Sequence, residues 1–341
     1  MGIALSGLFN PVEINIESLS GRKIAIDGNN ALYQFASTIR QYDGSFLMDS
    51  KGRVTSHLSG LFYRTMSLLK HGVKPCFVFD GKPPSFKNAT IGERVNAREK
   101  AREEYKLALE EEDFERAKSK AQQSTRITPE MFDESRALLD YMGVPVINAP
   151  SEGEAQASHM CFKGDVFACV SQDYDSLLFN SPILIRNLNI TGKRKLPQKN
   201  IYVNITPEKI VLQDELNRLG LFHDQLIMMG ILVGTDFNPK GIFGIGPKKA
   251  YDLVKQYPNF DTLFNNVKWT FDISPKEIFD FFKNPPVTND YNLHWKQPNP
   301  DKIFELLCDE HNFSKDRVEN TLGKLSQLRK KEGQTGLDKF F

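Results

Sequence analysis

Seven acidic residues stand out in the sequence because several directly follow short apolar runs and four form close pairs. Glu152-Gly153-Glu154 and Asp173-Tyr174-Asp175 each place two carboxylates two residues apart, a spacing that can aim both at one point. Oxygen ligands without histidine or cysteine favour Mg²⁺ or Mn²⁺ over zinc. We therefore expect one hard-cation site formed by Asp27, Asp80, Glu152, Glu154, Asp173, Asp175 and Asp236.

Charge repulsion determines how many ions such a site needs. Seven ionised carboxylates carry up to −7, and like charges at close range raise one another's pKa values. Two divalent ions contribute +4, and two ions about 4 Å apart can activate a water and stabilise the leaving oxygen of a phosphodiester. The alternative is a structural acidic cluster such as a Ca²⁺ site, although no EF-hand spacing is present.

The apolar runs before these acids are typical of strands buried on both faces, because they lack alternation and contain β-branched and aromatic residues. They span residues 23–26, 75–79, 144–147 and 166–170, and helix-like segments at 31–40, 57–70, 129–141 and 153–162 lie between them. Alternation of strands and helices predicts an α/β fold with a mainly parallel central sheet flanked by helices. Ligands bind at the carboxyl ends of such strands, where these acids fall. An aspartate at a strand end can also be a simple cap, but four such cases are hard to ascribe to capping.

The segment from Lys82 to Arg126 has a different composition. Its core, residues 97–120, consists of helix formers and charged residues with few apolar ones. A helix that is polar nearly all round cannot pack firmly into a core. We expect a mobile or arched projection, with a plain solvated helical hairpin as the alternative.

Four further helical segments are expected after the paired acids. Thr206 as N-cap and Pro207 at the first position predict a helix start. Residues 226–234 predict a buried helix that leads to Asp236, and residues 241–250 open another helix. Residues 274–331 look helical, with breaks at the prolines of 285–286 and 298–300.

Five sequence blocks resemble, in order, the motif series of the flap endonuclease family. They are IAID (24–27), VFDGKPP (78–84), APSEGEAQA (149–157), SQDYDSLL (171–178) and VGTD (233–236). The match runs from about residue 1 to 250 and resumes at the last residues. It implies a helical arch over the site, metal binding by all seven acids, and a monomer that cuts branched DNA one nucleotide inside the junction to release a 5′ flap. The family's place in Okazaki fragment maturation and DNA repair follows from the same resemblance.

The resemblance also implies particular DNA contacts. Lys87 and Arg94 match positions over the scissile phosphate, where they would stabilise charge that develops in the transition state. Arg98 would extend this basic face by one turn, with an ordinary solvated face as the alternative. Tyr33 matches a position that stacks on a nucleobase, and the alternative is a core tyrosine. Residues 55–58 resemble the part that receives a one-nucleotide 3′ flap.

A helix–turn–helix element for duplex backbone is implied by GIGPKKA at 244–250. Gly244 and Gly246 would let phosphate approach the main chain, and Lys248 and Lys249 would neutralise it without reading sequence. The family adds a K⁺ ion held by carbonyls of this element. The basic cluster of residues 193–199 is left open between a solvated loop and a DNA contact.

The chain ends in the pattern Q-x-x-L-x-x-F-F, formed by Gln334, Leu337, Phe340 and Phe341. Two phenylalanines on a polar tail need burial, and a docking partner supplies it. In the family this partner is the replicative sliding clamp (PCNA), and packing on the protein's own body is the alternative. The archaeal form is the closer resemblance, because eukaryotic relatives extend beyond this pattern.

Bulk properties restrict the remaining choices. The chain has 341 residues and a net charge of only +1, so DNA binding must rest on separated charges. Four scattered cysteines without a C-x-x-C pair indicate reduced thiols in an intracellular protein. No secretion or nuclear targeting signal and no membrane span is evident.

We expect a nuclease body at 1–98 and 126–258, an arch remainder at 99–125, a C-terminal helical region at 259–329 and the clamp tail at 330–341.

Three rival functions are kept. A sibling 5′→3′ exonuclease or bubble-cutting repair nuclease is the nearest, and the modest arch and clamp tail count against it. A non-catalytic junction binder that recruits the clamp would be expected to lack one or more acids, and none of the seven is missing. An RNA-directed nuclease of related fold is the third.

Overall fold

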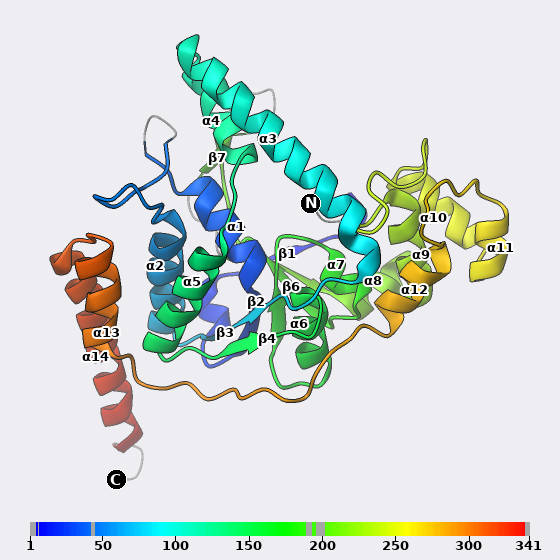
Figure 1. The fold of residues 1–341 in the computed structure, drawn as a ribbon. Coiled ribbons are helices and arrows are strands. Elements are labelled where there is room, and N and C mark those ends of the chain that lie inside the picture. The colour runs from blue at the N-terminus through cyan, green and yellow to red at the C-terminus, as the bar shows by residue number, and fades with distance from the viewer. Residues whose placement is uncertain (1–4, 6, 42–44, 189–192, 196–201, 338–341) are drawn as a thin grey trace.

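A seven-stranded sheet forms the centre of the computed structural model, which describes residues 5, 7–41, 45–188, 193–195 and 202–337 (Figure 1). The strand order is β1-β9-β6-β5-β2-β3-β4. Five neighbours are parallel: β6 (Ile183–Arg186), β5 (Ala168–Val170), β2 (Lys23–Asp27), β3 (Lys74–Phe79) and β4 (Val146–Asn148). Next to β6 lies β9 (Glu208–Val211), which pairs antiparallel with β6 on one side and with the edge strand β1 (Val12–Glu13) on the other. The predicted mainly parallel sheet is confirmed.

The strand order reverses direction between β2 and β5. From β2 the chain continues outward to β3 and β4, whereas β5 and β6 lie on the other side of β2. Such a reversal leaves a crevice at the carboxyl ends of the two strands, because their following segments diverge. Asp27 ends β2 and Asp173 follows β5, so the fold places both acids at this crevice.

Alternate residues of the central strands pack on opposite faces of the sheet. Ile24 and Ile26 join a core with α1 (Gly28–Thr38), α2 (Ser56–Lys70) and α5 (Pro129–Tyr141), whereas Ala25 faces α6 (Gly153–Phe162). The predicted helix bounds are confirmed for α5 and α6, and those of α1 and α2 differ by one to three residues. Burial on both faces explains why these strands show no polar alternation in the sequence.

A second core lies beside the sheet. Its aromatic centre is formed by Phe179, Phe237, Phe281 and Phe282, whose ring centroids lie 4.7–6.4 Å apart. The helices around it are α7 (Asp175–Leu178), α8 (Leu212–Leu219), α9 (His223–Val233), α10 (Pro247–Gln256), α11 (Phe260–Asn265) and α12 (Pro275–Lys283). This core fixes α9, which leads to Asp236.

The polar segment forms a helical hairpin that projects from the body (Figure 1). It consists of the short turn η2 (Ser85–Lys87), the long helix α3 (Asn88–Glu110) and the returning helix α4 (Phe114–Gln123). Its seam is built from buried alanines, namely Ala101, Ala108, Ala117 and Ala121. Small side chains let the two helices approach closely, so the hairpin needs no large apolar residues.

One predicted helix start is wrong. Residues 208–211 form strand β9, which pairs with β6 and β1, and the helix α8 begins only at Leu212. Pairing at the sheet edge outweighs the local signal from Thr206 and Pro207, which is a weak preference beside tertiary hydrogen bonds. The remaining short elements are η1 (Ile16–Leu19) and the hairpin β7 (Lys193–Lys195) and β8 (Tyr202–Asn204).

The prediction of helix over residues 274–331 is wrong for the stretch between its two proline breaks, because this region is helical only at its two ends. After α12, residues 284–299 form an extended strap across the body, drawn in orange in Figure 1. The Trp295 indole donates to the Pro75 carbonyl at 2.7 Å, and the main chain of Lys296 donates to Gly143 at 2.9 Å. The chain then forms α13 (Pro300–Phe304), η3 (Glu305–Glu310) and α14 (Lys315–Leu337), which packs on α2.

A buried network of histidines and carboxylates joins this C-terminal part to the body. His311 lies 3.2 Å from Asp49 through Nδ1 and 3.2 Å from Glu134 through Nε2, and both of its neighbours are carboxylates. His57 on α2 reaches the other Glu134 oxygen at 3.3 Å. Arg53 donates to Asp49 at 2.7 Å. Three segments distant in sequence, at residues 49–57, Glu134 and His311, are thus tied at one point.

All four cysteines are free and buried. Within the described ranges, no helix is both long and apolar enough to cross a bilayer.

Candidate active site

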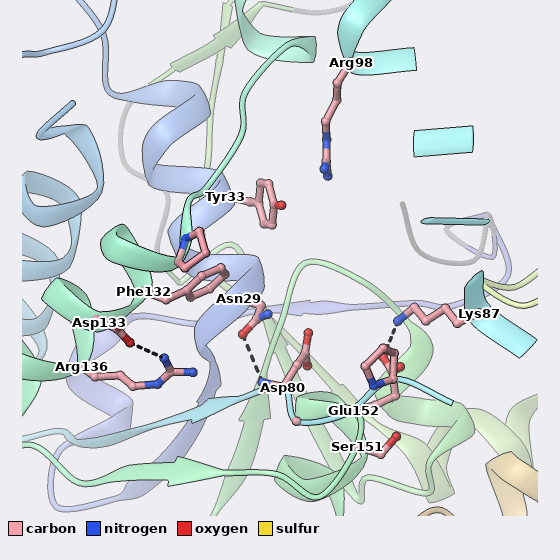
Figure 2. A pocket seen from close by; sticks show the side chains of 13 residues that line it. Asn29, Tyr33, Asp80, Lys87, Arg98, Phe132, Asp133, Arg136, Ser151 and Glu152 are labelled. Carbon is pink, nitrogen blue, oxygen red and sulfur yellow. Dashed lines mark hydrogen bonds and ion pairs between the residues drawn. The ribbon is translucent and has the colours of Figure 1, made fainter. Parts of the chain in front are cut away.

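All seven predicted carboxylates line one cavity of about 690 Å³ at the crevice of the sheet. The hairpin helices also line the cavity, with Ala97 and Arg98 from α3 and Gln123 from the end of α4. An adjoining pocket of about 480 Å³ shares Asp80, Lys87 and Glu152 with it and continues toward Phe132 and Arg136 (Figure 2). Figure 2 shows Asp80, Glu152 and Lys87 grouped at one side of this pocket, with Tyr33 and Arg98 above.

The first two acids are held by the strand ends and by neighbouring helix starts. Asp27 is the N-cap of α1 and accepts from the Asn30 N–H at 3.0 Å. Asp80 follows β3 and accepts from the Gly153 N–H at 2.7 Å, at the first turn of α6. A helix N-terminus favours a carboxylate because its unpaired N–H groups point outward. The turn residues thus orient both acids toward the cavity.

The paired acids are oriented by short side chains. Glu152 is the N-cap residue of α6, and Glu154 in its first turn accepts a short hydrogen bond from the Ser171 hydroxyl. Asp173 accepts from the Asn30 amide at 3.0 Å across the crevice, and Asp175 begins α7. Glu152 and Glu154 therefore lie at the start of a helix, whereas Asp173 lies in the turn before the helix that Asp175 begins.

Asp236 reaches the cavity from the second core. It follows α9 in a turn that Asn238 holds closed, because its side chain accepts from the Thr235 N–H at 3.1 Å and from the Thr235 hydroxyl at 2.7 Å. The Asn238 amide also donates to the Ile231 carbonyl at 2.7 Å. The turn ties Asp236 to the end of a buried helix.

Burial and mutual repulsion disfavour ionisation of these acids. Desolvation raises the pKa of Asp27 well above its usual range, and the charge of Asp80 adds to this. Desolvation likewise raises the pKa of Glu154 strongly, together with the charge of Asp175. The pKa values of Asp80 and Glu152 are also raised, first by desolvation. A cation bound in the cavity would stabilise the ionised form of these acids.

Lys87 supplies one positive charge inside this cluster. Its ammonium lies 2.6 Å from Glu152 and 3.6 Å from Asp236, and its side chain is 11% exposed. Desolvation alone would lower the pKa of Lys87, but the carboxylates of Glu152 and Asp236 reverse this and the pKa is raised. Lys87 is therefore a fixed cation at the junction of the hairpin and the cavity.

The donor set fits hard divalent cations. The seven carboxylates provide only oxygen, and a single lysine does not balance their charge. Among the described residues, no three acidic, histidine or cysteine side chains are so placed that they could hold a metal ion by themselves. The acids instead line the wall of a wide cavity. This arrangement suits Mg²⁺, which binds through few carboxylates and keeps waters and phosphate oxygens for its other positions.

The expected DNA contacts fall into two groups. The Arg98 guanidinium lies over the Tyr33 ring at 5.0 Å, and both residues line the cavity. Gly244, Gly246, Lys248 and Lys249 are exposed in the loop between α9 and α10 and in the first turn of α10. Arg94 lies on α3, but its side chain is outside the described part, as are the side chains of Gln334 and Leu337 on α14. Phe340 and Phe341 lie outside the described residues altogether.

Sequence reasoning missed three residues that orient the acids. Asn29 accepts from the Asp80 N–H at 3.2 Å, Asn30 contacts both Asp27 and Asp173, and Ser171 holds Glu154. The available signal was the Gly28-Asn29-Asn30 run directly after the first acid, because asparagine side chains commonly bond to nearby main chain. Arg136, which lies 4.8 Å over the Phe79 ring, had no such signal.

Comparison with known proteins gives a consistent set of matches. The family profile described as the XPG N-terminal domain matches residues 1–101, and the XPG I-region matches residues 143–236. Flap endonuclease 1 of Pyrococcus abyssi is 52% identical over 341 residues, which cover 100% of this chain and 98% of the relative. The corresponding protein of Pyrococcus furiosus is 51% identical over 341 residues, with coverage of 100% and 99%.

Solved structures agree with these matches. Flap endonuclease-1 from Methanococcus jannaschii has a TM-score of 0.76 at 42% identity, covering 97% of this chain and 100% of that chain. The catalytic core of Rad2 in complex with DNA substrate has a TM-score of 0.68 at 23% identity, covering 94% of this chain and 97% of that chain. The second likeness concerns the fold alone.

Proposed function

Because the chain belongs to the flap endonuclease family, we propose that it cuts 5′-flap DNA with two Mg²⁺ ions held by the seven carboxylates of its cavity. Structure-specific hydrolysis of phosphodiesters in 5′-flap DNA is the activity of this chain, in replication and repair. The observation that carries the mechanism is the gathering of all seven acids in one cavity beneath the hairpin.

The chain's own residues would hold the reacting groups in place. Asp27, Asp80, Glu152, Glu154, Asp173, Asp175 and Asp236 would hold the ions, with Mn²⁺ as a substitute. When bound, the ions supply water activation and charge stabilisation at the leaving oxygen. Lys87 already lies among these acids and would contact the scissile phosphate from the hairpin side. Arg94, seven residues further along α3, would share this task.

Tyr33, Arg98 and the helix–turn–helix element would position the DNA. Tyr33 lines the cavity and would stack on a nucleobase, and Arg98 lies over the Tyr33 ring. Base–aromatic stacking is worth roughly 1–3 kcal/mol. On the other side, Gly244, Gly246, Lys248 and Lys249 would bind duplex phosphates, with a K⁺ ion on the loop carbonyls as the resemblance implies. These contacts recognise shape and charge rather than sequence.

The terminal pattern would bind the replicative sliding clamp. Gln334, Leu337, Phe340 and Phe341 carry the pattern, and the first two lie at the C-terminal end of α14, which projects from the body in Figure 1. The protein would act as a monomer tethered to the clamp through this tail.

Cleavage of matched substrates tests the proposal. Wild-type protein with Mg²⁺ should cut a labelled 5′ flap at the junction, faster than it cuts nicked or bubble DNA, and EDTA should abolish cleavage but spare much of the binding. Preference for nicked or bubble DNA would favour a sibling nuclease. Binding of the junction without cleavage in any metal would favour the clamp recruiter, and normal cleavage in EDTA would exclude the metal mechanism.

A further inference from the structure

The loop that links α9 to α10 carries a fully exposed aromatic residue. Phe243 is 102% exposed at the tip of residues 241–244, while the flanking Ile242 and Ile245 pack against the second core. An exposed phenylalanine of this degree makes no contact that stabilises the fold, so the fold does not explain its presence. Its surroundings indicate what it contacts.

The loop is braced rather than free to fold back over the ring. The Ile242 N–H donates to Leu232 at 2.9 Å, and the Ile245 N–H donates to Ile242 at 3.0 Å. Gly241 has φ +58°, and a Cβ there would lie 2.3 Å from the Val233 carbonyl, so the tip is pressed on the end of α9. Asn238 closes the preceding turn. The same braced segment contains Asp236 of the cavity.

Exposed lysines flank the tip on both sides in the sequence. Lys240, Lys248 and Lys249 are exposed, and within the described residues the structure gives none of them an ion-pair partner. Gly246 is the N-cap of α10, has an ordinary φ of −93°, and a Cβ there would meet nothing within 4 Å. Neither strain nor internal packing explains this glycine, whereas a phosphate that approaches the helix N-terminus does. The acid nearest along α10 is Asp252, one turn beyond Lys248.

An apolar ring between lysines matches the chemistry of a nucleic-acid backbone. The sugar faces that line the minor groove of a duplex are apolar, and the phosphates on either side are anionic. A membrane or a protein partner would need a wider apolar surface than one ring. Charge complementarity and the single protruding ring thus favour duplex DNA as the occupant.

We propose that Phe243 packs against deoxyribose faces in the minor groove of the bound duplex while Lys248 and Lys249 neutralise the flanking phosphates. This inference rests on the proposed function, because it takes duplex DNA as the ligand. The braced loop gives the contact a consequence: Phe243 and Asp236 belong to one rigid segment, so the seated ring sets the position of the duplex relative to the cavity.

Salt dependence distinguishes this apolar contact from a phosphate contact. Each phosphate contact that is lost lowers the slope of log Kd against log salt by about 1, whereas loss of an apolar contact leaves the slope unchanged. The Kd of the full chain for a fluorescent 5′-flap substrate would be measured by anisotropy in EDTA over a range of salt. Phe243→Ala should raise Kd by roughly tenfold at every salt concentration, and Lys248→Ala should lower the slope.

Phe222→Ala is the matched control, because Phe222 is 80% exposed at the other end of α9. It should bind like wild type, and both phenylalanine variants should keep the wild-type Tm. The inference is overturned if wild type binds but Phe243→Ala binds equally well, or if Phe243→Ala changes the salt slope. If wild type itself does not bind the flap substrate, the proposed function fails instead.

Discussion

The Lys87 ammonium lies 2.6 Å from a Glu152 carboxylate oxygen, so the base of the hairpin and the N-terminus of α6 meet inside the acidic cavity. Every movement of the hairpin base therefore moves a positive charge relative to the acids. Lys87 also lies 3.6 Å from Asp236, so it connects acids from two different parts of the fold.

Removal of this charge should impair the chemical step. Lys87→Ala is expected to lower kcat for 5′-flap cleavage by about 10²–10³-fold, the usual loss when one group that stabilises transition-state charge is removed. Single-turnover cleavage with saturating enzyme measures the effect, because it separates chemistry from binding. Lys82→Ala, an exposed neighbour on the same approach to the hairpin, is the control and should cut normally. Equal rates for the two variants would remove Lys87 from the mechanism.

Loss of one cavity acid should uncouple binding from cleavage. Asp173→Ala is expected to bind flap DNA but to cut it at least about 10³-fold more slowly, because the ions contribute several kcal/mol. Gel-shift and cleavage assays on one substrate compare the two properties. Asp272→Ala, an exposed acid outside the cavity, should match wild type. Normal cutting by Asp173→Ala would show that the carboxylate cluster has another purpose.

Neutralisation of a cavity acid should stabilise the metal-free protein. The raised pKa of Asp27 means that its contribution to stability is present at low pH and is lost as pH rises through the folded-state pKa. Asp27→Asn keeps an N-cap acceptor for the Asn30 N–H. In EDTA at neutral pH its Tm should exceed that of wild type by roughly 2 °C or more, and the difference should vanish at about pH 4.

Stabilisation by metal binding should also depend on pH, because the ions bind the ionised carboxylates. Mg²⁺ should raise the Tm of wild type at neutral pH, and by less in acid, where the carboxylates are protonated. A Tm of Asp27→Asn below that of wild type in EDTA would contradict the charge repulsion inferred for the cavity.

The buried histidine network should contribute pH-dependent stability. Burial alone would raise the pKa of Glu134, but His311 and His57 hold it at about 2. A depressed pKa contributes stability above the unfolded value that is lost as pH falls toward 2. Glu134→Gln should therefore lower the free energy of unfolding by about 1–2 kcal/mol at neutral pH, with allowance for partial exposure. Urea titrations from neutral to acid pH should show this deficit shrinking.

Asp140→Asn provides the control for that series. Asp140 lies on the same helix and is 69% exposed, with Lys296 at 3.9 Å. Asp140→Asn should change the free energy of unfolding little at any pH. A deficit in Glu134→Gln that is constant with pH would point to packing rather than charge.

The terminal phenylalanines should matter only for the clamp. Replacement of both Phe340 and Phe341 by alanine is expected to lower clamp affinity by at least tenfold, since buried aromatic anchors dominate such contacts. Flap cleavage without the clamp should stay unchanged. The two measurements are clamp affinity by calorimetry and stimulation of cleavage by the clamp. If the variant keeps both, the terminal phenylalanines pack on the protein's own body instead of binding the clamp.

The α/β sheet could be predicted from the sequence because its buried strands are unbroken apolar runs that end in acids. All seven acids of the predicted site line one cavity, yet their metal-binding role stays a prediction. The prediction of a helix start at β9 is wrong because its partner strands β1 and β6 are distant in sequence. A local N-cap signal carries no information about pairing with such distant strands.

Other structural features could not be predicted from the sequence, for similar reasons. The alanine seam between α3 and α4 carries little hydrophobic signal, so the hairpin looked unable to pack. The strap of residues 284–299 depends on single contacts such as Trp295 to Pro75, which join positions 220 apart. Asn29 and Ser171 orient acids from other segments, and only the three-dimensional arrangement reveals such partners.

The packing of α14 on α2 bears on the order in which the chain acquires its structure during synthesis. Leu58 and Phe62 of α2 share one core with Ile303, Val318 and Leu325 from the far end of the chain. While a ribosome is still making the middle of the protein, this face of α2 has no native cover and exposes apolar side chains. The strap then carries the last helices back across the body, so completion of the first core waits for the final segment to emerge.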